Sequence, residues 1–240
     1  MTQGNFEQSA NKLYWVKDNL LATGFPGVNS ALRDPDGLLA IGGDLTEHRL
    51  LEAYQAGIFP WFNEGQPILW WSPDPRCVLM PNEIKVSRSL SKRIRNKHFK
   101  ITFNTAFADV LEGCAASRKG VEDTWITNDI KIAYLKLFKM GYAHSIECWQ
   151  DNALVGGLYG LAMGKVFFGE SMFSWKADAS KVALVELTTQ LIEKDFKLID
   201  CQVHSKHLQT LGAKPIHRKM FIQILENYCS MEKVNAWDTP

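Results

Sequence analysis

The sequence has no apolar run that approaches the roughly 18 residues of a membrane-spanning helix. Residues 1–15 are polar and lack the basic stretch followed by an apolar one that marks a signal peptide. We therefore expect a cytoplasmic protein with no membrane contact. The net charge is only +1, so any nucleic-acid surface has to be local rather than a basic field over the whole molecule.

The sequence also lacks the cysteine and histidine spacings that are typical of disulfide frameworks and metal sites. The odd number and wide spacing of the cysteines favour buried free thiols in a reducing compartment. The five of them never form a CxxC pair: Cys77, Cys114, Cys148, Cys201 and Cys229. None of the six histidines falls into a Cys/His ligand spacing, so we expect no metal site.

The signatures of several enzyme classes are absent. There is no P-loop, no GxSxG turn and no Cys–His pair that the sequence alone would nominate. The glycine-rich segment 156–160 (GGLYG) lies inside a predicted strand, so it is not a dinucleotide fingerprint. Its glycines favour a bulge or the close approach of a ligand to the backbone.

One segment, Gly57–Leu79, is rich in aromatic residues and proline, with three Trp, two Phe and four Pro. Because proline removes a backbone donor and fixes φ, we expect neither a regular helix nor a central strand here. The aromatic side chains are typical either of a buried hinge between two subdomains or of the wall of a pocket. With 46% hydrophobic and 22% charged residues, the chain can form one large domain or two unequal ones.

Periodicity and capping signals predict the main elements. Turn formers and a helix near 47–56, with Thr46 as its N-cap, predict a small N-terminal subdomain of roughly 60 to 80 residues. Three strands, at 145–150, 153–161 and 165–171, read as an antiparallel meander. Further elements are expected as a strand at 100–103, helices at 105–118, 127–141 and 179–194, a strand at 197–203 and a short helix at 205–211.

The segment Ile84–Lys100 contains seven Lys or Arg residues and no acid. Leu90 and Ile94 are four residues apart, which predicts a helix with a thin apolar seam and a basic remainder. This helix is either a solvated surface or a contact for a polyanion. Solvated faces usually mix the two signs of charge, so the unbroken positive charge favours a phosphate backbone.

Polar residues interrupt two predicted core strands. Glu170 directly follows an apolar stretch, and a buried carboxylate needs a partner, a ligand or a raised pKa. It could equally hydrogen-bond a loop. Asp200 and Gln202 should share one face of the strand at 197–203, where they could orient a nucleophile and hold a developing charge, or merely cap the strand.

The motifs resemble, in their order, those of the bacterial leucyl/phenylalanyl-tRNA–protein transferases. The resemblance runs from about residue 26 to residue 212. The motifs are GIFPWF, PILWWSPDPR, SRS, TWIT, HSIE, GGLYG, FFGESMFS, ASK and LIDCQ. The resemblance implies an enzyme that transfers Leu or Phe, and less well Met, from aminoacyl-tRNA to the α-amine of proteins that begin with Arg or Lys. The product carries a signal for degradation by the N-end rule.

The fold implied by the resemblance is α+β. A small N-terminal α+β domain, residues 1–80, would precede a GNAT-like acyltransferase domain, residues 81–240, with a mixed, mainly antiparallel sheet. The loop that holds the coenzyme A pyrophosphate in GNAT acetyltransferases is missing, since the segment after the meander reads FSWKAD. The resemblance therefore implies no cofactor, a donor carried by tRNA, and a monomer.

Site residues follow from the resemblance position by position. The catalytic residues would be Asp200, Gln202 and Glu170. The pocket for the transferred side chain would contain Leu158, Phe167, Leu187 and Leu191, with Trp61 and Trp125 facing the adenosine end. The tRNA surface would contain Arg88, Lys92, Arg93 and Arg95. Family members often have Met in place of Leu158 and Phe in place of Leu187, so the preference for Leu or Phe stays open.

The mechanism implied is aminolysis of an activated ester. We hypothesise that Gln202, oriented by Asp200, hydrogen-bonds the attacking amine and helps to remove its proton. Alternatively, the tRNA ribose hydroxyl relays the proton while Asp200 only positions the amine. Glu170 would orient the aminoacyl amino group or a substrate cation. The competing interpretations are a coenzyme A-dependent N-acyltransferase, a non-catalytic tRNA-binding module and a peptidoglycan-type aminoacyl transferase.

Overall fold

A four-stranded sheet forms the N-terminal part of the computed structural model, which describes residues 13–18, 24–116 and 124–232. The strand order is β1-β2-β4-β3, with β1 parallel to β2 and the other neighbours antiparallel. The strands are β1 (Tyr14–Val16), β2 (Leu38–Gly42), β3 (Phe59–Pro60) and β4 (Leu69–Trp71). A short 3₁₀ helix, η1 (Val28–Ser30), precedes β2.

Helix α1 (Glu47–Gln55) follows β2 and confirms the helix predicted near 47–56. Thr46 occupies its N-cap position, but the Thr46 side chain accepts no capping hydrogen bond. The carboxylate of Asp44 instead accepts from the Thr46 backbone N–H at 3.0 Å. The helix buries Leu50, Leu51 and Tyr54, the three residues of its predicted apolar stripe.

A second sheet has seven strands in the order β11-β5-β10-β9-β8-β7-β6. Only β10 and β9 run parallel, so the sheet is mixed and mainly antiparallel. The strands are β5 (Arg76–Leu79), β6 (Lys100–Phe103), β7 (Ala143–Gln150), β8 (Ala153–Met163), β9 (Val166–Ser174), β10 (Leu198–Asp200) and β11 (Lys214–Ile216). The meander predicted from the sequence is confirmed as β7, β8 and β9.

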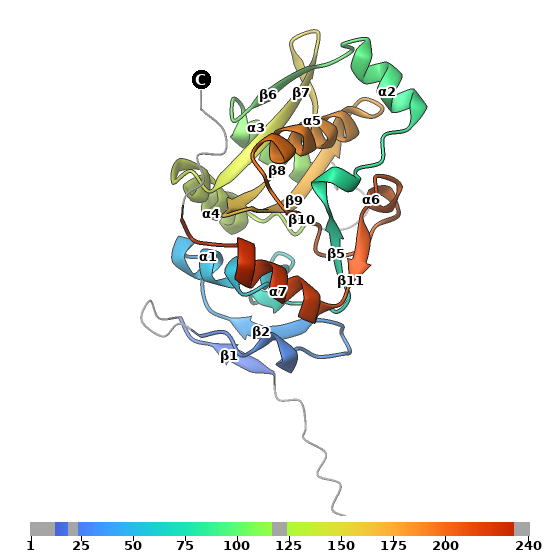
Figure 1. Cartoon of the computed structure of the whole chain (residues 1–240). Coiled ribbons are helices and arrows are strands. Elements are labelled where there is room, and N and C mark those ends of the chain that lie inside the picture. The colour runs from blue at the N-terminus through green and yellow to red at the C-terminus, as the bar shows by residue number, and fades with distance from the viewer. Residues whose placement is uncertain (1–12, 19–23, 117–123, 233–240) are drawn as a thin grey trace, which may run out of the picture.

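Helices cover both faces of this sheet (Figure 1). Successive residues of β8 point to opposite faces: Tyr159 belongs to the core that includes α3 and α4, and Leu158 to the core that includes α5. Burial on both faces explains why β8 is apolar along its length. The helices are α2 (Arg88–Arg95), α3 (Phe107–Ala116), α4 (Asn128–Lys139), α5 (Ala179–Glu193), α6 (Lys206–Thr210) and α7 (Arg218–Tyr228), with the 3₁₀ helix η2 (Pro81–Glu83) before α2.

Two predictions from the sequence are wrong in detail. The segment Gly57–Leu79 does contain a central strand, because its last four residues form β5 between β11 and β10. The four prolines of the segment all precede β5, so they cost its ladder no hydrogen bond. The basic helix is shorter than the segment 84–100, since it begins after the N-cap residue Ser87 and ends at Arg95.

The C-terminal helix α7 returns to the N-terminal part, where it lies next to α1 in Figure 1. Gly57 has φ +76°, and a Cβ there would come within 2.7 Å of Ile222 and 3.0 Å of Phe221 on α7. Thus β5, which directly follows the N-terminal sheet in the sequence, and α7, near the C-terminal end of the described chain, join the two sheets into one structure. The division at residue 80 stays a prediction, since the strand just before it lies in the large sheet.

Several further properties belong to the part of the chain that the structure describes. All five cysteines are free and buried, which confirms the expectation from their spacing. No described helix has the length and apolar character needed to cross a bilayer. Across residues 13–18, 24–116 and 124–232, no three His, Cys, Asp or Glu side chains gather in a way that could hold a metal ion. The predicted end of the helix at Arg118 lies outside the described residues.

Candidate active site

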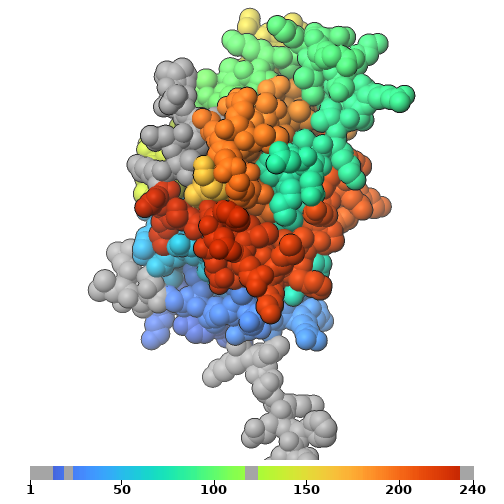
Figure 2. All heavy atoms as spheres, in the orientation of Figure 1, coloured from blue at the N-terminus to red at the C-terminus, as the bar shows by residue number. Residues whose placement is uncertain are grey.

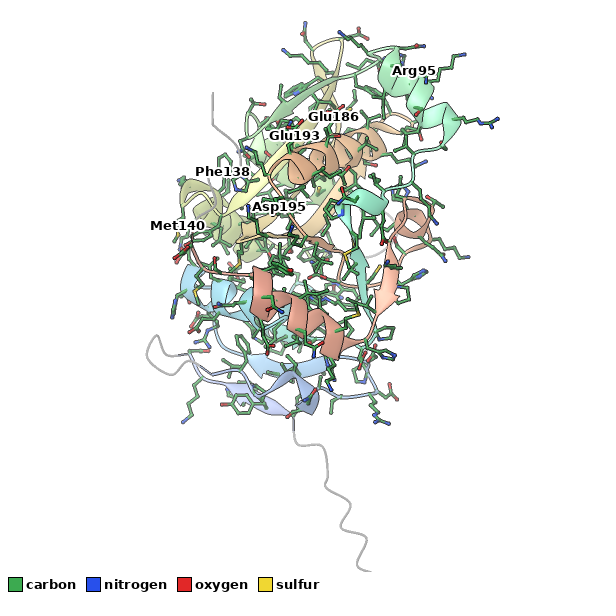
Figure 3. The ribbon with its side chains drawn as sticks, in the orientation of Figure 1. Arg95, Phe138, Met140, Glu186, Glu193 and Asp195 are labelled. Carbon is green, nitrogen blue, oxygen red and sulfur yellow. The ribbon has the colours of Figure 1, made fainter. Side chains whose placement is uncertain are left out.

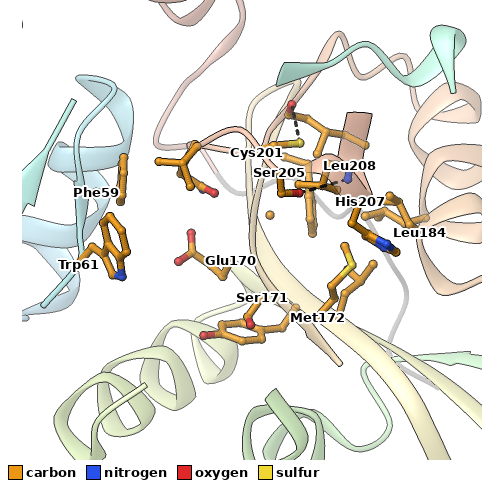
Figure 4. Close-up of a pocket in the computed structure, with 18 of the residues that line it drawn as sticks. Phe59, Trp61, Glu170, Ser171, Met172, Leu184, Cys201, Ser205, His207 and Leu208 are labelled. Carbon is orange, nitrogen blue, oxygen red and sulfur yellow. Dashed lines mark hydrogen bonds between the residues drawn. The ribbon is translucent and has the colours of Figure 1, made fainter. Parts of the chain in front are cut away.

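A cavity of about 270 Å³ opens between the two parts of the structure. Figure 4 shows Phe59 and Trp61 from the N-terminal part on one side, and Leu184, His207 and Leu208 from helices α5 and α6 on the other. Strands β8, β9 and β10 contribute the floor between them. The aromatic segment therefore walls a pocket, as the second interpretation of it predicts.

Seven residues predicted for the site line this one cavity although they are far apart in the sequence. They are Trp61, Trp125, Leu158, Phe167, Glu170, Leu187 and Gln202. Two predicted members do not line it. Leu191 lies one turn beyond Leu187 on α5, and Asp200 is fully buried behind the wall.

The inner end of the cavity is apolar. Leu158 on β8, Phe167 on β9 and Leu187 on α5 expose at most 2% of their surface. Gly160 makes room for Phe167, because a Cβ at Gly160 would come within 2.6 Å of the Phe167 ring. The β8–β9 register shifts between Tyr159 and Gly160, which confirms the bulge that the glycines indicate.

Sequence reasoning missed several lining residues. Leu184 precedes Leu187 by three positions on α5, so helical spacing alone could have identified it. Met172 lies two positions after Glu170 on β9, so the alternation of side chains along a strand could have identified it. His207 lies at the rim on α6, where partial burial and the nearby Lys181 lower its pKa. No local pattern marks it.

Glu170 has the partners that a buried carboxylate requires. Its Oε1 accepts from the Tyr54 hydroxyl at 2.7 Å and its Oε2 from the Tyr134 hydroxyl at 2.8 Å. The two tyrosines are fully buried and their hydroxyl oxygens also contact each other, so a hydrogen bond between them requires the proton of a protonated Glu170. Burial raises the pKa of Glu170 from 4.5 to about 7, although both tyrosine hydrogen bonds lower it. Of the partner, ligand or raised pKa that the sequence predicts for this carboxyl group, the two tyrosine hydroxyls confirm the partner.

Asp200 and Gln202 are arranged differently from the prediction. Strand β10 ends at Asp200, and Gln202 has a left-handed backbone with φ +54°, so the two residues do not alternate along one strand. The Asp200 carboxylate forms a two-point ion pair with Arg76 at 2.8 and 2.7 Å. Its Oδ1 also accepts from the Gln202 backbone N–H at 3.0 Å. Asp200 thus reaches the cavity only through Gln202.

The side chain of Gln202 lines the cavity and is about nine-tenths buried, with 9% of its surface exposed. Within the described residues its Nε2 has no hydrogen-bond partner. A buried amide donor without a partner is costly unless a ligand or water satisfies it. Within the described chain, the site therefore has an amide with an unpartnered, buried nitrogen in its wall and one carboxylate, beside an apolar recess.

The basic helix α2 lies at the edge of the molecule, in green at the top right of Figure 2. The Ser87 hydroxyl caps it by accepting from the Leu90 N–H at 3.2 Å. Leu90 is buried and Ile94 half-buried, which confirms the thin apolar seam. Arg88, Lys92 and Arg95 are exposed, and Figure 3 shows Arg95 at the outer edge of the molecule.

Arg93 connects this helix to the cavity. Its Nε lies 3.2 Å from Oδ2 of Asp178, the residue just before α5, and Asp178 also pairs with Lys181 at 3.0 Å. Helix α5 carries Leu184 and Leu187 of the recess. This ion pair therefore ties the basic helix α2 to α5, the helix that shapes the apolar end of the cavity.

Comparison with known proteins identifies the family. The model of the leucyl/phenylalanyl-tRNA protein transferase family matches residues 78–226, and the model of its N-terminal domain matches residues 43–74. The chain belongs to this family. The family name describes a transferase that uses leucyl- or phenylalanyl-tRNA and a protein.

Curated members of the family match nearly the whole chain. A leucyl/phenylalanyl-tRNA–protein transferase from Stutzerimonas stutzeri is 53% identical over 225 residues, which cover 94% of this chain and 99% of that protein. A relative with this name from Chromohalobacter salexigens is 57% identical and covers 91% and 84%. One from Thiobacillus denitrificans is 58% identical and covers 83% and 88%.

Among solved structures, a GCN5-related N-acetyltransferase from Kribbella flavida matches with a TM-score of 0.37 and 13% identity, over 72% of this chain and 61% of that one. The predicted α+β class, with a small N-terminal domain and a second domain that has a mixed, mainly antiparallel sheet, is confirmed by the two sheets and by the two family models. The GNAT-like character of the second domain stays a prediction.

Proposed function

We propose that the chain transfers Leu or Phe, and Met less well, from aminoacyl-tRNA to the α-amine of proteins that begin with Arg or Lys. The peptide bond formed would mark these proteins for N-end-rule degradation. One observation carries the proposal: a single cavity joins an apolar recess to Glu170 and Gln202, and a basic helix is ion-paired to the start of α5, which lines the recess. The names of relatives more than 50% identical support the donor and the protein acceptor.

The apolar recess would take the Leu or Phe side chain. Leu158, Phe167 and Leu187 form it, and Leu191 supports Leu187 from the next turn of α5. Trp61 and Trp125 would contact the adenosine end by stacking, which tolerates any base because every base has a π-face. The phosphates of the acceptor stem would lie along α2, on Arg88, Lys92, Arg93 and Arg95.

The chemistry is an attack of the acceptor α-amine on the ester carbonyl carbon of the aminoacyl-tRNA. The new C–N bond forms, the C–O bond to the ribose breaks, and the amine proton passes to the ribose oxygen. An unperturbed α-amine has a pKa of about 7.7–8.0, so a useful fraction is neutral at cellular pH. Holding the two reactants in place can therefore supply much of the acceleration, about 7–11 kcal/mol in favourable cases.

Gln202 would act directly on the reacting groups. Its Oε1 would accept from the α-amine, and rotation of the amide would bring the buried Nε2 to the carbonyl oxygen, where negative charge develops. The missing partner of Nε2 among the described residues supports this role. Asp200 would fix Gln202 rather than take the proton, since its carboxylate is bound to Arg76 and to the Gln202 N–H.

Glu170 would hold a cation. The aminoacyl ester carries a free ammonium group, and the acceptor carries a basic first side chain, so a carboxylate at the mouth of the recess suits either one. The tyrosine pair leaves Glu170 partly exposed to the cavity. The residues proposed for the site all belong to one chain, which supports action as a monomer. The donor, aminoacyl-tRNA, is a cytoplasmic molecule, which supports a cytoplasmic location.

The first test uses purified protein, labelled Leu-tRNA and two peptides, one beginning with Arg and one with Ala. We expect label on the Arg peptide alone. Bound tRNA with no transfer to either peptide would favour the non-catalytic tRNA-binding module. Equal transfer to both peptides would support the proposed tRNA donor but contradict the preference for Arg or Lys acceptors. The chain would then be another tRNA-dependent aminoacyl transferase.

A further inference from the structure

Arg76 is a fully buried arginine on the central strand β5, at the end of the motif PILWWSPDPR. A buried guanidinium is costly unless charge pairing and hydrogen bonds compensate it, so its neighbours should reveal its role. It does not line the cavity. Any role in the reaction must therefore pass through another residue.

The guanidinium of Arg76 contacts a carboxylate, a backbone carbonyl and two aromatic rings. Nε donates to Asp200 Oδ1 at 2.8 Å and Nη2 donates to Oδ2 at 2.7 Å, which is the two-point geometry that only arginine provides. Nη1 donates to the Gly57 carbonyl at 3.2 Å. The rings of Phe59 and Phe221 lie 4.7 and 4.6 Å from its central carbon and stabilise the cation by their π-faces.

The same arrangement holds Gln202 by both of its peptide groups. Asp200 Oδ1, oriented by Arg76, accepts from the Gln202 N–H at 3.0 Å. The Gln202 carbonyl accepts from the N–H of Cys77, the residue next to Arg76, at 3.1 Å. Gln202 has φ +54°, a conformation that non-glycine residues adopt only when their surroundings impose it. Its Nε2 lies buried in the cavity wall without a partner among the described residues.

We infer that Arg76 is a positioning residue for the transfer reaction: through Asp200 it holds Gln202 in the left-handed conformation that places the amide in the cavity. The inference rests on the role proposed above for Gln202. Lysine is a poor replacement for Arg76, because its single nitrogen cannot make the two parallel hydrogen bonds to Asp200 and also reach the Gly57 carbonyl. With a lysine there, Asp200 can rotate and the amide of Gln202 loses its fixed position.

The test compares Arg76→Lys with Arg49→Lys. Arg49 is a matched control, since it is also buried and binds both oxygens of a carboxylate, Asp44, at 3.1 and 3.0 Å. We expect Arg76→Lys to lower kcat about 10- to 100-fold, as misplacement of a reacting group does, with KM for Leu-tRNA within twofold of wild type. We expect Arg49→Lys to leave both parameters within about twofold, because an ion pair outside the site affects stability alone.

A double-mutant cycle with Gln202→Ala identifies the route of the effect. If Arg76 acts through Gln202, adding Arg76→Lys to Gln202→Ala should lower kcat no further. A second, equal loss in that background, or an unchanged kcat in Arg76→Lys alone, would overturn the inference and leave the proposed function standing. Full kcat in Gln202→Ala alone would remove the proposed role of Gln202, and the inference with it.

A second variant serves if Arg76→Lys does not fold. Asp200→Asn keeps the volume of the side chain but removes the charge that Arg76 binds. The inference then requires a fall in kcat that disappears in the Gln202→Ala background, with KM for Leu-tRNA unchanged. An Asp200→Asn enzyme with wild-type kcat would overturn the inference.

Discussion

Glu170 is a carboxyl group that the fold keeps largely out of water, between the hydroxyls of Tyr54 and Tyr134. Its pKa is about 7 in the folded protein against 4.5 in water. The folded state therefore binds more protons than the unfolded chain between these two pH values. The contribution of Glu170 to stability is fully present below pH 4.5 and is lost as the pH rises to about 7.

We predict that Glu170→Gln removes this loss. From pH 5 to pH 8, the free energy of unfolding of the variant should rise by about 2 kcal/mol relative to wild type. Urea unfolding at both pH values measures the difference. The matched control is Glu193→Gln, an exposed carboxyl group on α5 that is labelled in Figure 3. A parallel pH dependence of Glu170→Gln and wild type would contradict the prediction.

Selectivity between Leu and Phe is also decided at single residues. Leu187→Ala should enlarge the recess, so that kcat/KM for Phe-tRNA divided by that for Leu-tRNA rises about tenfold, within the 1–3 kcal/mol that pocket shape can supply. The ratio of the two donors cancels any loss of folded enzyme.

Leu191→Ala is the control for that experiment. Leu191 is equally buried on the same helix but does not line the cavity. Both variants should lose about 2–5 kcal/mol of stability, yet only Leu187→Ala should change the donor ratio. Equal donor ratios in the two variants would show that Leu187 does not shape the recess.

At the scale of elements, helix α2 concentrates positive charge on a chain whose net charge is only +1. We predict that Arg88→Ala together with Arg95→Ala weakens tRNA binding and flattens its salt dependence. Each phosphate contact that is lost should reduce the slope of log K against log salt by about 0.7–0.9. Binding titrations from 50 to 200 mM salt, roughly the range over which this effect is large, provide the measurement.

The matched control removes two exposed lysines elsewhere, with Lys139→Ala on α4 and Lys219→Ala on α7. It changes the net charge by the same amount. A slope reduced equally in both double variants would mean that total charge, not α2, sets the salt dependence.

Elements with complete local signals were predictable from the sequence. Helix α4 begins after Thr127, whose hydroxyl accepts from the Ile130 N–H at 3.3 Å, and its end is followed by Gly141 at φ +81°. Strand β10 was predicted too long because apolar residues recur at alternate positions past Asp200, at Cys201 and Val203. The chain turns there since Asp200 and Cys77 hold the Gln202 peptide groups, and these are contacts that the local pattern does not contain.

At the scale of the whole molecule, α7 connects the two sheets. Phe221 is fully buried on α7 and lies against the Arg76 guanidinium, which also touches Phe59 of β3. We predict that Phe221→Ala lowers the free energy of unfolding by about 3–5 kcal/mol, because it leaves a cavity where the two parts meet. Urea unfolding followed by tryptophan fluorescence measures the change.

The neighbouring variant Met220→Ala is the control, since Met220 is 52% exposed. It should change stability by no more than about 0.5 kcal/mol. Equal stability of the two variants would mean that α7 does not join the two parts of the molecule.

The meander and most helix boundaries were predictable from the sequence because they depend on periodicity and caps, which are local. The α+β class and most of the seven cavity residues followed from motifs shared with a known family. The sequence could not show that Arg76 pairs with Asp200 across 124 positions, or that Tyr54 and Tyr134 hold Glu170. Such pairs depend on which strands become neighbours in the sheets and which helices pack on them. The tertiary structure alone brings these side chains within hydrogen-bonding distance, and so decides which groups face the cavity and which only hold them there.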